Sequence, residues 1–591
     1  MAAFLAPDHH YLEAWNDAEP KKNHFSLAQP AITPIFKTRA AQESFMVWAG
    51  ETNVDYFEFV KNNWKTRFFK GGNFQSFWDK CLYDGVLELP VEASTVSFSG
   101  DVNAAANAIA TNYKTSAGFE LAIYENGTVG NGSQANNPLL QELPEPMTKA
   151  VWDHYVLISQ KDAATAGITN PESKTRYANV SANGKTVKLP VLIQPGLAQG
   201  VLAVAIGYGR TKAGKVADGI GANVYPMISM TNGSLNFSAG EAKFELLDEA
   251  YQIAQTQTHH TYMARQTVIK EYTLSEVREN PDLLKKGFAP KVATWLDPEH
   301  QVKPGELSMW KGHDYKNHHW GMAIDLNTCT GCAACVVACN VENNVALVGR
   351  EEVINRREMH WLRIDRYYSS DAPVDDWKGL EEASDNPEVV FQPMLCQHCN
   401  NAPCETVCPV AATTHSTEGL NQMTYNRCIG TRYCANNCPY KVRRFNWFKY
   451  HDNKQFEKSN VAQTSDIGKM VLNPDVTVRS RGVMEKCSFC VQKIQAGKLT
   501  AKKEKRELKD GEVTTACQTA CSTGAITFGD MNDENSKISK LLKLRPANPD
   551  RPYGIDKIAE NPRAYSVLEE IGVKPNIFYL TKIRNKEAAK A

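Results

Sequence analysis

The chain has 591 residues, a formal net charge of zero and 42% hydrophobic residues. At roughly 150 residues per domain, this length predicts about four domains. Its 66 basic and 66 acidic residues disfavour a nucleic-acid binder that depends on a broad basic surface. The most apolar long window, Leu189–Gly209, is interrupted by polar residues, proline and glycine, so no direct membrane span is predicted.

The first half of the chain contains apolar runs separated by glycine and proline. Two of them, Thr186–Ile193 and Gly200–Ile206, have the character of strands, which predicts a β-rich barrel domain over residues 116–275. Residues 276–318, rich in proline, glycine and charged side chains, are predicted to link this domain to the second half.

Three polar features of the chain are given structural interpretations. The histidine pairs His259–His260 and His318–His319 are interpreted as surface residues, because adjacent side chains do not face one site on a regular element. The basic and aromatic stretch Lys441–Tyr450 is interpreted as a solvated or packed arm, with a docking surface for a membrane partner as the alternative.

Cysteines concentrate in the second half of the chain. Only Cys81 lies outside it, and a lone cysteine is most often a small buried apolar residue. The other fifteen form four groups: Cys329, Cys332, Cys335 and Cys339; Cys396, Cys399, Cys404 and Cys408; Cys428, Cys434 and Cys438; Cys487, Cys490, Cys517 and Cys521.

Three chemistries compete for these cysteines. Disulfides suit small secreted scaffolds, and structural zinc uses CxxC pairs separated by a loop. In the first group, three cysteines are spaced two residues apart and a fourth follows after three, which is the bacterial ferredoxin spacing. Iron–sulfur clusters are therefore favoured over zinc and disulfides. No CxxC is followed by histidine, which excludes covalent c-type haem within this chain.

Ferredoxin loops exchange their fourth cysteines, which predicts how the groups combine. We nest the first group with the fourth and the second with the third. The predicted metal ligands are Cys329, Cys332, Cys335 and Cys521 for cluster one; Cys487, Cys490, Cys517 and Cys339 for cluster two; Cys396, Cys399, Cys404 and Cys438 for cluster three; and Cys428, Cys434 and Cys408 for cluster four.

Cluster four lacks one thiolate in this scheme. Thr431 occupies the position where the third group should hold its second cysteine. A neutral hydroxyl is a poor iron ligand beside a thiolate, so the corner iron would be lost easily. We therefore expect three [4Fe-4S] clusters and one [3Fe-4S] cluster, with a [4Fe-4S] cluster completed by water or Thr431 as the alternative.

The second half resembles the four-cluster iron–sulfur subunits of the complex iron–sulfur molybdoenzyme superfamily. The likeness runs from about residue 320 to 579. Four segments carry it: Trp320–Asn327, Gln397–Cys404, Cys438–Trp447 and Glu485–Cys490. The sequence departs from the family pattern at two positions: Asn340 follows Cys339, and Ser522 follows Cys521, where the family has proline.

The first half is similar to molybdopterin oxidoreductases. Segments 132–144 and 207–210 look like their carboxy-terminal dinucleotide-binding domain, and segment 10–21 looks like part of the preceding domain. The resemblance implies an α+β fold: a partial molybdopterin-oxidoreductase-like segment (1–115), a molybdopterin-dinucleotide-binding-like β-barrel domain without cofactor (116–275), the linker (276–318), and a double bacterial-ferredoxin-like domain with a tail (319–591).

This fusion resembles the large fused iron–sulfur subunit of bacterial alternative complex III, a quinol oxidoreductase. The resemblance implies an electron-transfer subunit without molybdenum, held at the periplasmic face of the inner membrane by a polytopic quinol-binding membrane subunit, with a multihaem cytochrome c subunit and other respiratory subunits as partners. Family members are longer at the amino end, where the export signal lies, so the chain is expected to begin within a domain.

Two other functions remain open at this point. One is a molybdopterin oxidoreductase, such as a polysulfide- or nitrate-reductase-like enzyme, with a fused electron subunit. The other is a zinc-bound assembly scaffold. No catalytic arrangement of nucleophile and base is apparent in the sequence.

Overall fold

The computed structural model describes residues 4–112, 118–231, 233–285, 291–295, 298–299, 301–302, 312–460 and 465–586. The chain divides into two compact units, residues 1–113 and 114–591. Parts of the predicted linker 276–318 lie outside the described residues. Across the described ranges, no helix is both long and apolar enough to cross a membrane.

The first unit is a small sheet packed against helices. Strand β2 (His24–Ala28) pairs antiparallel with β1 (Asn16–Lys21) and β3 (Val86–Glu88). Its helices are α1 (Ala41–Trp48), α2 (Tyr56–Phe68), α3 (Phe74–Asp84) and α4 (Val102–Asn112). Val60, Trp64 and Phe68 lie four residues apart on one face of α2 and pack with Trp78 and Cys81. The buried Cys81 thus belongs to an apolar core.

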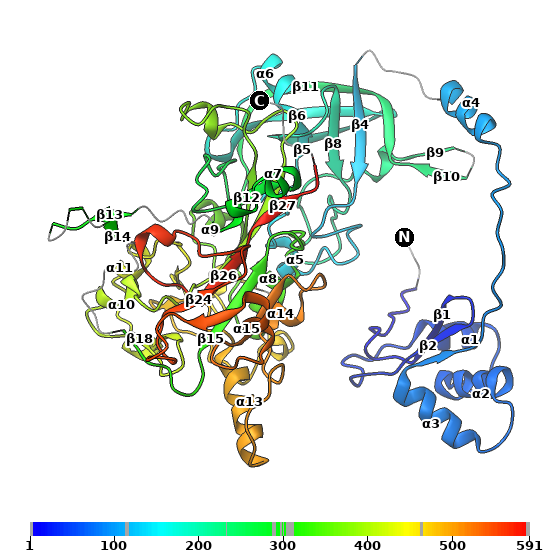
Figure 1. Ribbon diagram of the computed structural model, residues 1–591. Coiled ribbons are helices and arrows are strands. Elements are labelled where there is room, and N and C mark those ends of the chain that lie inside the picture. The colour runs from blue at the N-terminus through cyan, green and yellow to red at the C-terminus, as the bar shows by residue number, and fades with distance from the viewer. Residues whose placement is uncertain are drawn as a thin grey trace. The chain divides into compact units, whose positions relative to one another are not determined.

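The second unit begins with a closed six-stranded barrel. Its strands close in the order β11 (Ser238–Gln252), β4 (Phe119–Tyr124), β8 (Val201–Ala205), β5 (Val156–Ile158), β7 (Lys185–Ile193) and β6 (Lys174–Ala182). Figure 1 labels β4, β5, β6, β8 and β11 of this barrel. The long strand β11 pairs with both β4 and β6. Its register shifts once along the pairing with β4 and once along the pairing with β6. Apolar side chains from all six strands fill the interior.

Helices and short strands complete the first part of this unit. They are α5 (Pro138–Gln141), α6 (Gln160–Thr165), β9 (Ser229–Thr231), β10 (Ser234–Asn236), β12 (Glu271–Thr273), α7 (Leu274–Glu279), β13 (Val292–Ala293) and β14 (Gln301–Val302). Strand β12 pairs in parallel with β27 (Lys582–Arg584), so the segment after the barrel is tied to the carboxy-terminal part of the chain.

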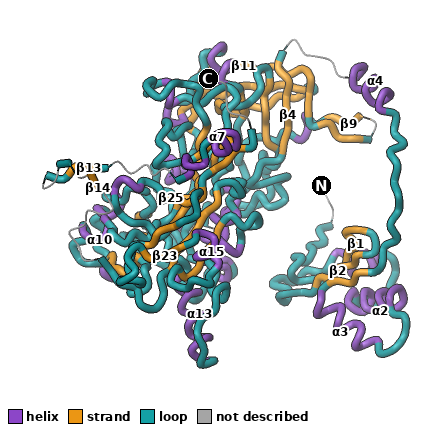
Figure 2. The backbone as a smooth tube through the Cα atoms, viewed as in Figure 1, coloured by secondary structure: helices purple, strands orange, loops and turns teal. Residues whose placement is uncertain are grey.

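The cysteine-rich part is built around a four-stranded sheet. The strands run in the order β22 (Ile526–Asp530), β15 (Trp320–Asp325), β26 (Ile577–Leu580) and β25 (Ala564–Tyr565). Figure 2 shows that loops and turns make up most of this part. Its helices are α8 (Ala334–Glu342), α9 (Arg350–Ile354), α10 (Pro403–Thr406), α11 (Tyr433–Asn436), α13 (Val491–Lys503), α14 (Ala516–Thr519) and α15 (Lys537–Leu542).

Four short antiparallel ladders connect these helices. They are β16 (Arg363–Tyr368) with β17 (Val389–Met394), β18 (Thr413–His415) with β19 (Asn421–Met423), β20 (Arg444–Phe445) with β21 (Met484–Glu485), and β23 (Leu544–Pro546) with β24 (Lys557–Ala559). The fold of the second unit is therefore mixed α and β.

The barrel side and the cysteine-rich side of this unit share one core. Leu143, Val151 and Trp152 belong to the same buried cluster as the residues around the cysteines. The carboxylate of Glu142 accepts hydrogen bonds from the amides of Val348 (2.9 Å) and Gly349 (2.7 Å). These contacts explain why residues 114–591 form one compact unit.

The interpretation of the histidine pairs as surface residues is wrong for His319. Its side chain is fully buried, and its Nε2 lies 2.9 Å from Asn576 Oδ1. His318 is half-buried against Asp530. In the segment 441–450, Asn446 and Tyr450 are both fully buried. These two residues therefore fit the interpretation of this segment as a packed arm.

Candidate iron–sulfur centres

The four cysteine groups share one backbone feature. In each group, the residue two positions after the first cysteine has a positive φ: Gly331 (74°), His398 (45°), Gly430 (76°) and Phe489 (55°). This conformation is uncommon for residues other than glycine and persists where the surrounding structure over-determines it. All four loops therefore have a residue with positive φ at the same position after their first cysteine.

The first and third loops correspond residue by residue. Gly331 and Gly430 have nearly equal φ angles, and so do Ala333 (62°) and Arg432 (61°). Ala333 directly precedes helix α8, and Arg432 directly precedes helix α11. This register places Thr431, which is exposed, at the position of Cys332.

The first and fourth groups come together through helices α8 and α14, which pack against each other. Burial raises the pKa of the Cys335 thiol well above its usual range, and charge repulsion from further thiols adds to this: Cys517, Cys329, Cys332 and Cys521. Burial likewise raises the pKa of Cys339, and the thiols that add to it are Cys487, Cys490 and Cys517. The structure thus brings the thiols of these two groups close together.

The second and third groups come together through α10 and α11. Burial raises the pKa of Cys399, and the thiols that add to it are Cys396, Cys404 and Cys438. Burial also raises the pKa of Cys434, with contributions from Cys428 and Cys408. Three thiols and Thr431 line one small cavity: Cys408, Cys428 and Cys434.

Several thiols accept hydrogen bonds. Cys408 Sγ accepts from the Ala412 amide (3.2 Å), and Cys487 Sγ accepts from the Phe489 amide (3.4 Å). Side-chain amides add two more, from Asn343 to Cys339 (3.6 Å) and from Asn421 to Cys404 (3.7 Å). Donors to sulfur favour the thiolate and are among the groups that set the reduction potential of an iron–sulfur cluster.

The donor set fits iron–sulfur clusters. Within the described ranges, no group of three or more His, Cys, Asp or Glu side chains is arranged to hold a single metal ion. A cluster of several irons and sulfides holds its cysteines further apart than one ion does, and ferredoxin-type clusters are bound by cysteine thiolates. The four groups supply such thiolates from loops that share a positive φ at the same position.

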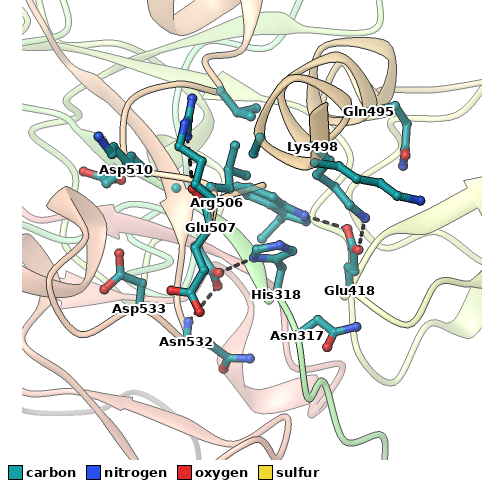
Figure 3. Close-up of a pocket in the computed structure, with 18 of the residues that line it drawn as sticks. Asn317, His318, Glu418, Gln495, Lys498, Arg506, Glu507, Asp510, Asn532 and Asp533 are labelled. Carbon is teal, nitrogen blue, oxygen red and sulfur yellow. Dashed lines mark hydrogen bonds and ion pairs between the residues drawn. The ribbon is translucent and has the colours of Figure 1, made fainter. Parts of the chain in front are cut away.

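A separate cavity of about 980 Å³ lies beside α13, which projects from the rest of the unit (Figure 1). Two pairs of polar side chains lie in this cavity: Lys498 with Glu418, labelled in Figure 3, and His318 with Asp530 at 2.7 Å. The bond to Asp530 raises the pKa of His318. The cavity therefore has a polar, charged lining, and none of the fifteen cysteines lies in it.

The sequence analysis did not single out two buried cations near the cysteines. Arg443 lies within the arm 441–450, and Lys486 directly precedes Cys487. Basic residues are normally exposed, so no spacing rule identifies them. The only signal in the sequence is their position beside cysteine motifs.

Two family models, each described as a 4Fe-4S dicluster domain, match residues 328–412 and 387–464. These matches confirm the prediction of ferredoxin-type iron–sulfur domains.

Curated relatives match the same half of the chain. The iron–sulfur cluster-binding subunit of menaquinone reductase from Nitratidesulfovibrio vulgaris is 36% identical over 268 residues, which cover 44% of this chain and 89% of that subunit. The Hdr-like menaquinol oxidoreductase iron–sulfur subunit 1 from Archaeoglobus fulgidus is 31% identical, covering 45% of this chain and 84% of the relative. The iron–sulfur subunit of arsenate respiratory reductase from Shewanella sp. is 28% identical, covering 45% and 98%.

The spacing of the cysteines, the loop conformations they share and these matches agree on one assignment. Through its cysteine-rich part, the chain belongs to the family of iron–sulfur cluster-binding subunits that includes the one of menaquinone reductase.

Proposed function

We propose that the chain is the electron-transfer subunit of a quinol oxidoreductase of the alternative complex III type. When bound, the iron–sulfur clusters supply one-electron transfer steps. The observation that supports the proposal is that cysteine groups far apart in the sequence lie close together: α8 of the first group packs against α14 of the fourth, and α10 of the second packs against α11 of the third. A chain of such centres suits conduction of electrons between partners.

Fifteen cysteines would hold the clusters. Cys329, Cys332, Cys335 and Cys521 would hold the first, and Cys487, Cys490, Cys517 and Cys339 the second. Cys396, Cys399, Cys404 and Cys438 would hold the third, and Cys428, Cys434 and Cys408 the fourth. The packing of α8 on α14 and of α10 on α11, and the cavity that Cys408, Cys428 and Cys434 share, support this assignment.

The fourth centre would hold a [3Fe-4S] cluster and the others [4Fe-4S] clusters. The matching φ angles of the first and third loops support this, because they put a hydroxyl where the first loop has a thiol. A hydroxyl on Thr431 is neutral and binds iron weakly compared with a thiolate.

The barrel would serve as a scaffold of the molybdopterin-dinucleotide-binding type without molybdenum. Segments that flank the barrel strands share a core with the cysteine-rich part, which supports a structural role. The partners would be a polytopic quinol-binding membrane subunit and a multihaem cytochrome c subunit at the periplasmic face. The names of two relatives, menaquinone reductase and menaquinol oxidoreductase, support a quinone-linked complex.

The test of this proposal is the variant Cys521→Ser. Iron content and low-temperature electron paramagnetic resonance should show loss or damage of the cluster held by Cys329, Cys332 and Cys335. Cys81→Ala, a cysteine of the first unit's core, is the matched control and should keep all signals. If Cys521→Ser perturbs only the cluster held by Cys487 and Cys490, the pairing is wrong.

A further inference from the structure

Two buried cations lie among the second, third and fourth cysteine groups. Arg443 is 6% exposed to solvent, and Lys486 is 2% exposed. No carboxylate of the described residues lies within ion-pairing distance of either one. Taking an unpaired charge out of water is costly, so a buried cation normally has an anionic partner.

Another buried cation nearby shows how such a charge is usually balanced. Arg479 and Glu485 are both fully buried and form an ion pair of 2.9 Å. Arg443 instead donates to neutral groups: Thr413 Oγ1 (3.1 Å) and Asn421 Oδ1 (2.9 Å). Lys486 donates to the backbone carbonyls of Asn421 and Cys487.

Asn421 joins both cations to a thiol. Its side-chain oxygen Oδ1 accepts a hydrogen bond from Arg443, and its backbone carbonyl accepts one from Lys486. Its side-chain nitrogen Nδ2 donates to Cys404 Sγ (3.7 Å). The nearby carboxylate of Glu405 bonds Asn421 and His415 and does not pair with either cation. Asn421 therefore links both cations to a thiol, and neither cation forms an ion pair with a carboxylate of the described residues.

Arg443 lies beside two centres. Asn421 links its guanidinium to the Cys404 thiol of the third centre. The guanidinium also hydrogen-bonds the Cys434 thiol of the fourth centre, which opposes the rise that burial causes in the pKa of that thiol. Lys486 acts with Arg443 on Cys404. Thiolates and a reduced cluster are the anions that would balance these charges.

We propose that Arg443 and Lys486 are positioning residues that raise the reduction potentials of neighbouring clusters, Arg443 those of the third and fourth centres and Lys486 that of the third. This inference rests on the proposed function. One electron adds one negative charge to the cluster and no bond changes, so a fixed cation stabilises the reduced form. The net charge around a cluster is one of the determinants of its potential.

The experiment is a redox titration of the purified full chain, followed by electron paramagnetic resonance. Arg443→Gln and Lys486→Gln remove a charge, whereas Arg443→Lys keeps it. Lys582→Gln is the matched control, because the charge of Lys582 acts on Cys329 of the first centre. Iron and sulfide analysis of every variant establishes that its clusters are assembled.

In Arg443→Gln, the ratio of reduced to oxidised cluster at a fixed potential should fall at least tenfold at the third and fourth centres, which is a shift of about 59 mV for one electron. Lys486→Gln should shift the third centre in the same direction, and Arg443→Lys should stay within threefold of wild type. Lys582→Gln should shift the first centre alone.

Unchanged potentials in an assembled Arg443→Gln protein would overturn the inference, and so would an Arg443→Lys protein that shifts as far as the Gln variant. If Arg443→Gln fails to assemble, Lys486→Gln and Arg443→Lys decide by the same criteria. Absence of clusters from the wild-type chain would instead refute the proposed function.

Discussion

Glu142 offers a sharp test of how the barrel side is joined to the cysteine-rich side. Its carboxylate is fully buried and accepts hydrogen bonds from the amides of Val348 and Gly349, at the start of α9, and from Trp152 Nε1 (3.1 Å). Burial raises the pKa of this carboxyl from 4.5 to about 7, although these donors oppose the shift. The folded chain therefore binds a proton that the unfolded chain has already released.

The sign and size of the effect follow from this shift. Between about pH 4.5 and pH 7 the folded state holds more protons, so the free energy of unfolding falls as the pH rises and is constant above that range. At 1.36 kcal/mol per pKa unit, the whole change amounts to about 3 kcal/mol. The variant Glu142→Gln keeps the shape of the side chain without a titrating proton, so it should lose this pH dependence.

The assay is hydrogen exchange of the peptide that contains residues 348 and 349, measured from pH 5 to pH 8 and corrected for the intrinsic exchange rate. Protection in the wild-type chain should fall with rising pH, by up to about 3 kcal/mol of opening free energy, and should stay level in Glu142→Gln. Glu351→Gln is the control, because it removes an exposed carboxylate from α9, the helix that follows residues 348 and 349. Equal pH slopes in wild type and Glu142→Gln would refute the reasoning.

Two further predictions concern the fourth centre and the first unit. Thr431→Cys should supply the missing thiolate, convert the [3Fe-4S] cluster to [4Fe-4S] and lower its reduction potential. The oxidised three-iron resonance signal should therefore disappear, and quinol oxidation should slow. A variant that keeps this signal would contradict the assignment. Trp78→Ala removes a buried ring from the core of the first unit and should cost about 3–5 kcal/mol of that unit's stability, seen as faster limited proteolysis within residues 4–112. Iron content should not change in that variant, and loss of iron would show that the first unit is needed to hold the clusters.

The cysteine chemistry could be predicted from the sequence because it is local. Each group spans few residues, and the spacing within Cys329–Cys339 dictates a loop followed by a helical turn, which is the conformation found for α8. The position of Thr431 could also be predicted, since the third loop repeats the first. Local spacing says nothing about the neutral or charged groups that distant segments bring to the sulfur atoms.

The features that were missed depend on long-range contacts. His319 is buried because Asn576, in a remote segment, bonds its ring. Arg443 is buried because Thr413 and Asn421, from the β18–β19 ladder, accept its hydrogen bonds. The apolar runs predicted two strands of the barrel, but β11 mixes polar and apolar residues without clear alternation. Such positions are determined by tertiary packing rather than by sequence pattern.

The most direct test of the proposed function is the metal content of the purified oxidised chain together with its low-temperature electron paramagnetic resonance spectrum. The account predicts about fifteen iron atoms per chain, no stoichiometric molybdenum and an oxidised three-iron signal. Zinc in place of iron, molybdenum with a bound pterin, or a fully iron-loaded chain without the three-iron signal would contradict it.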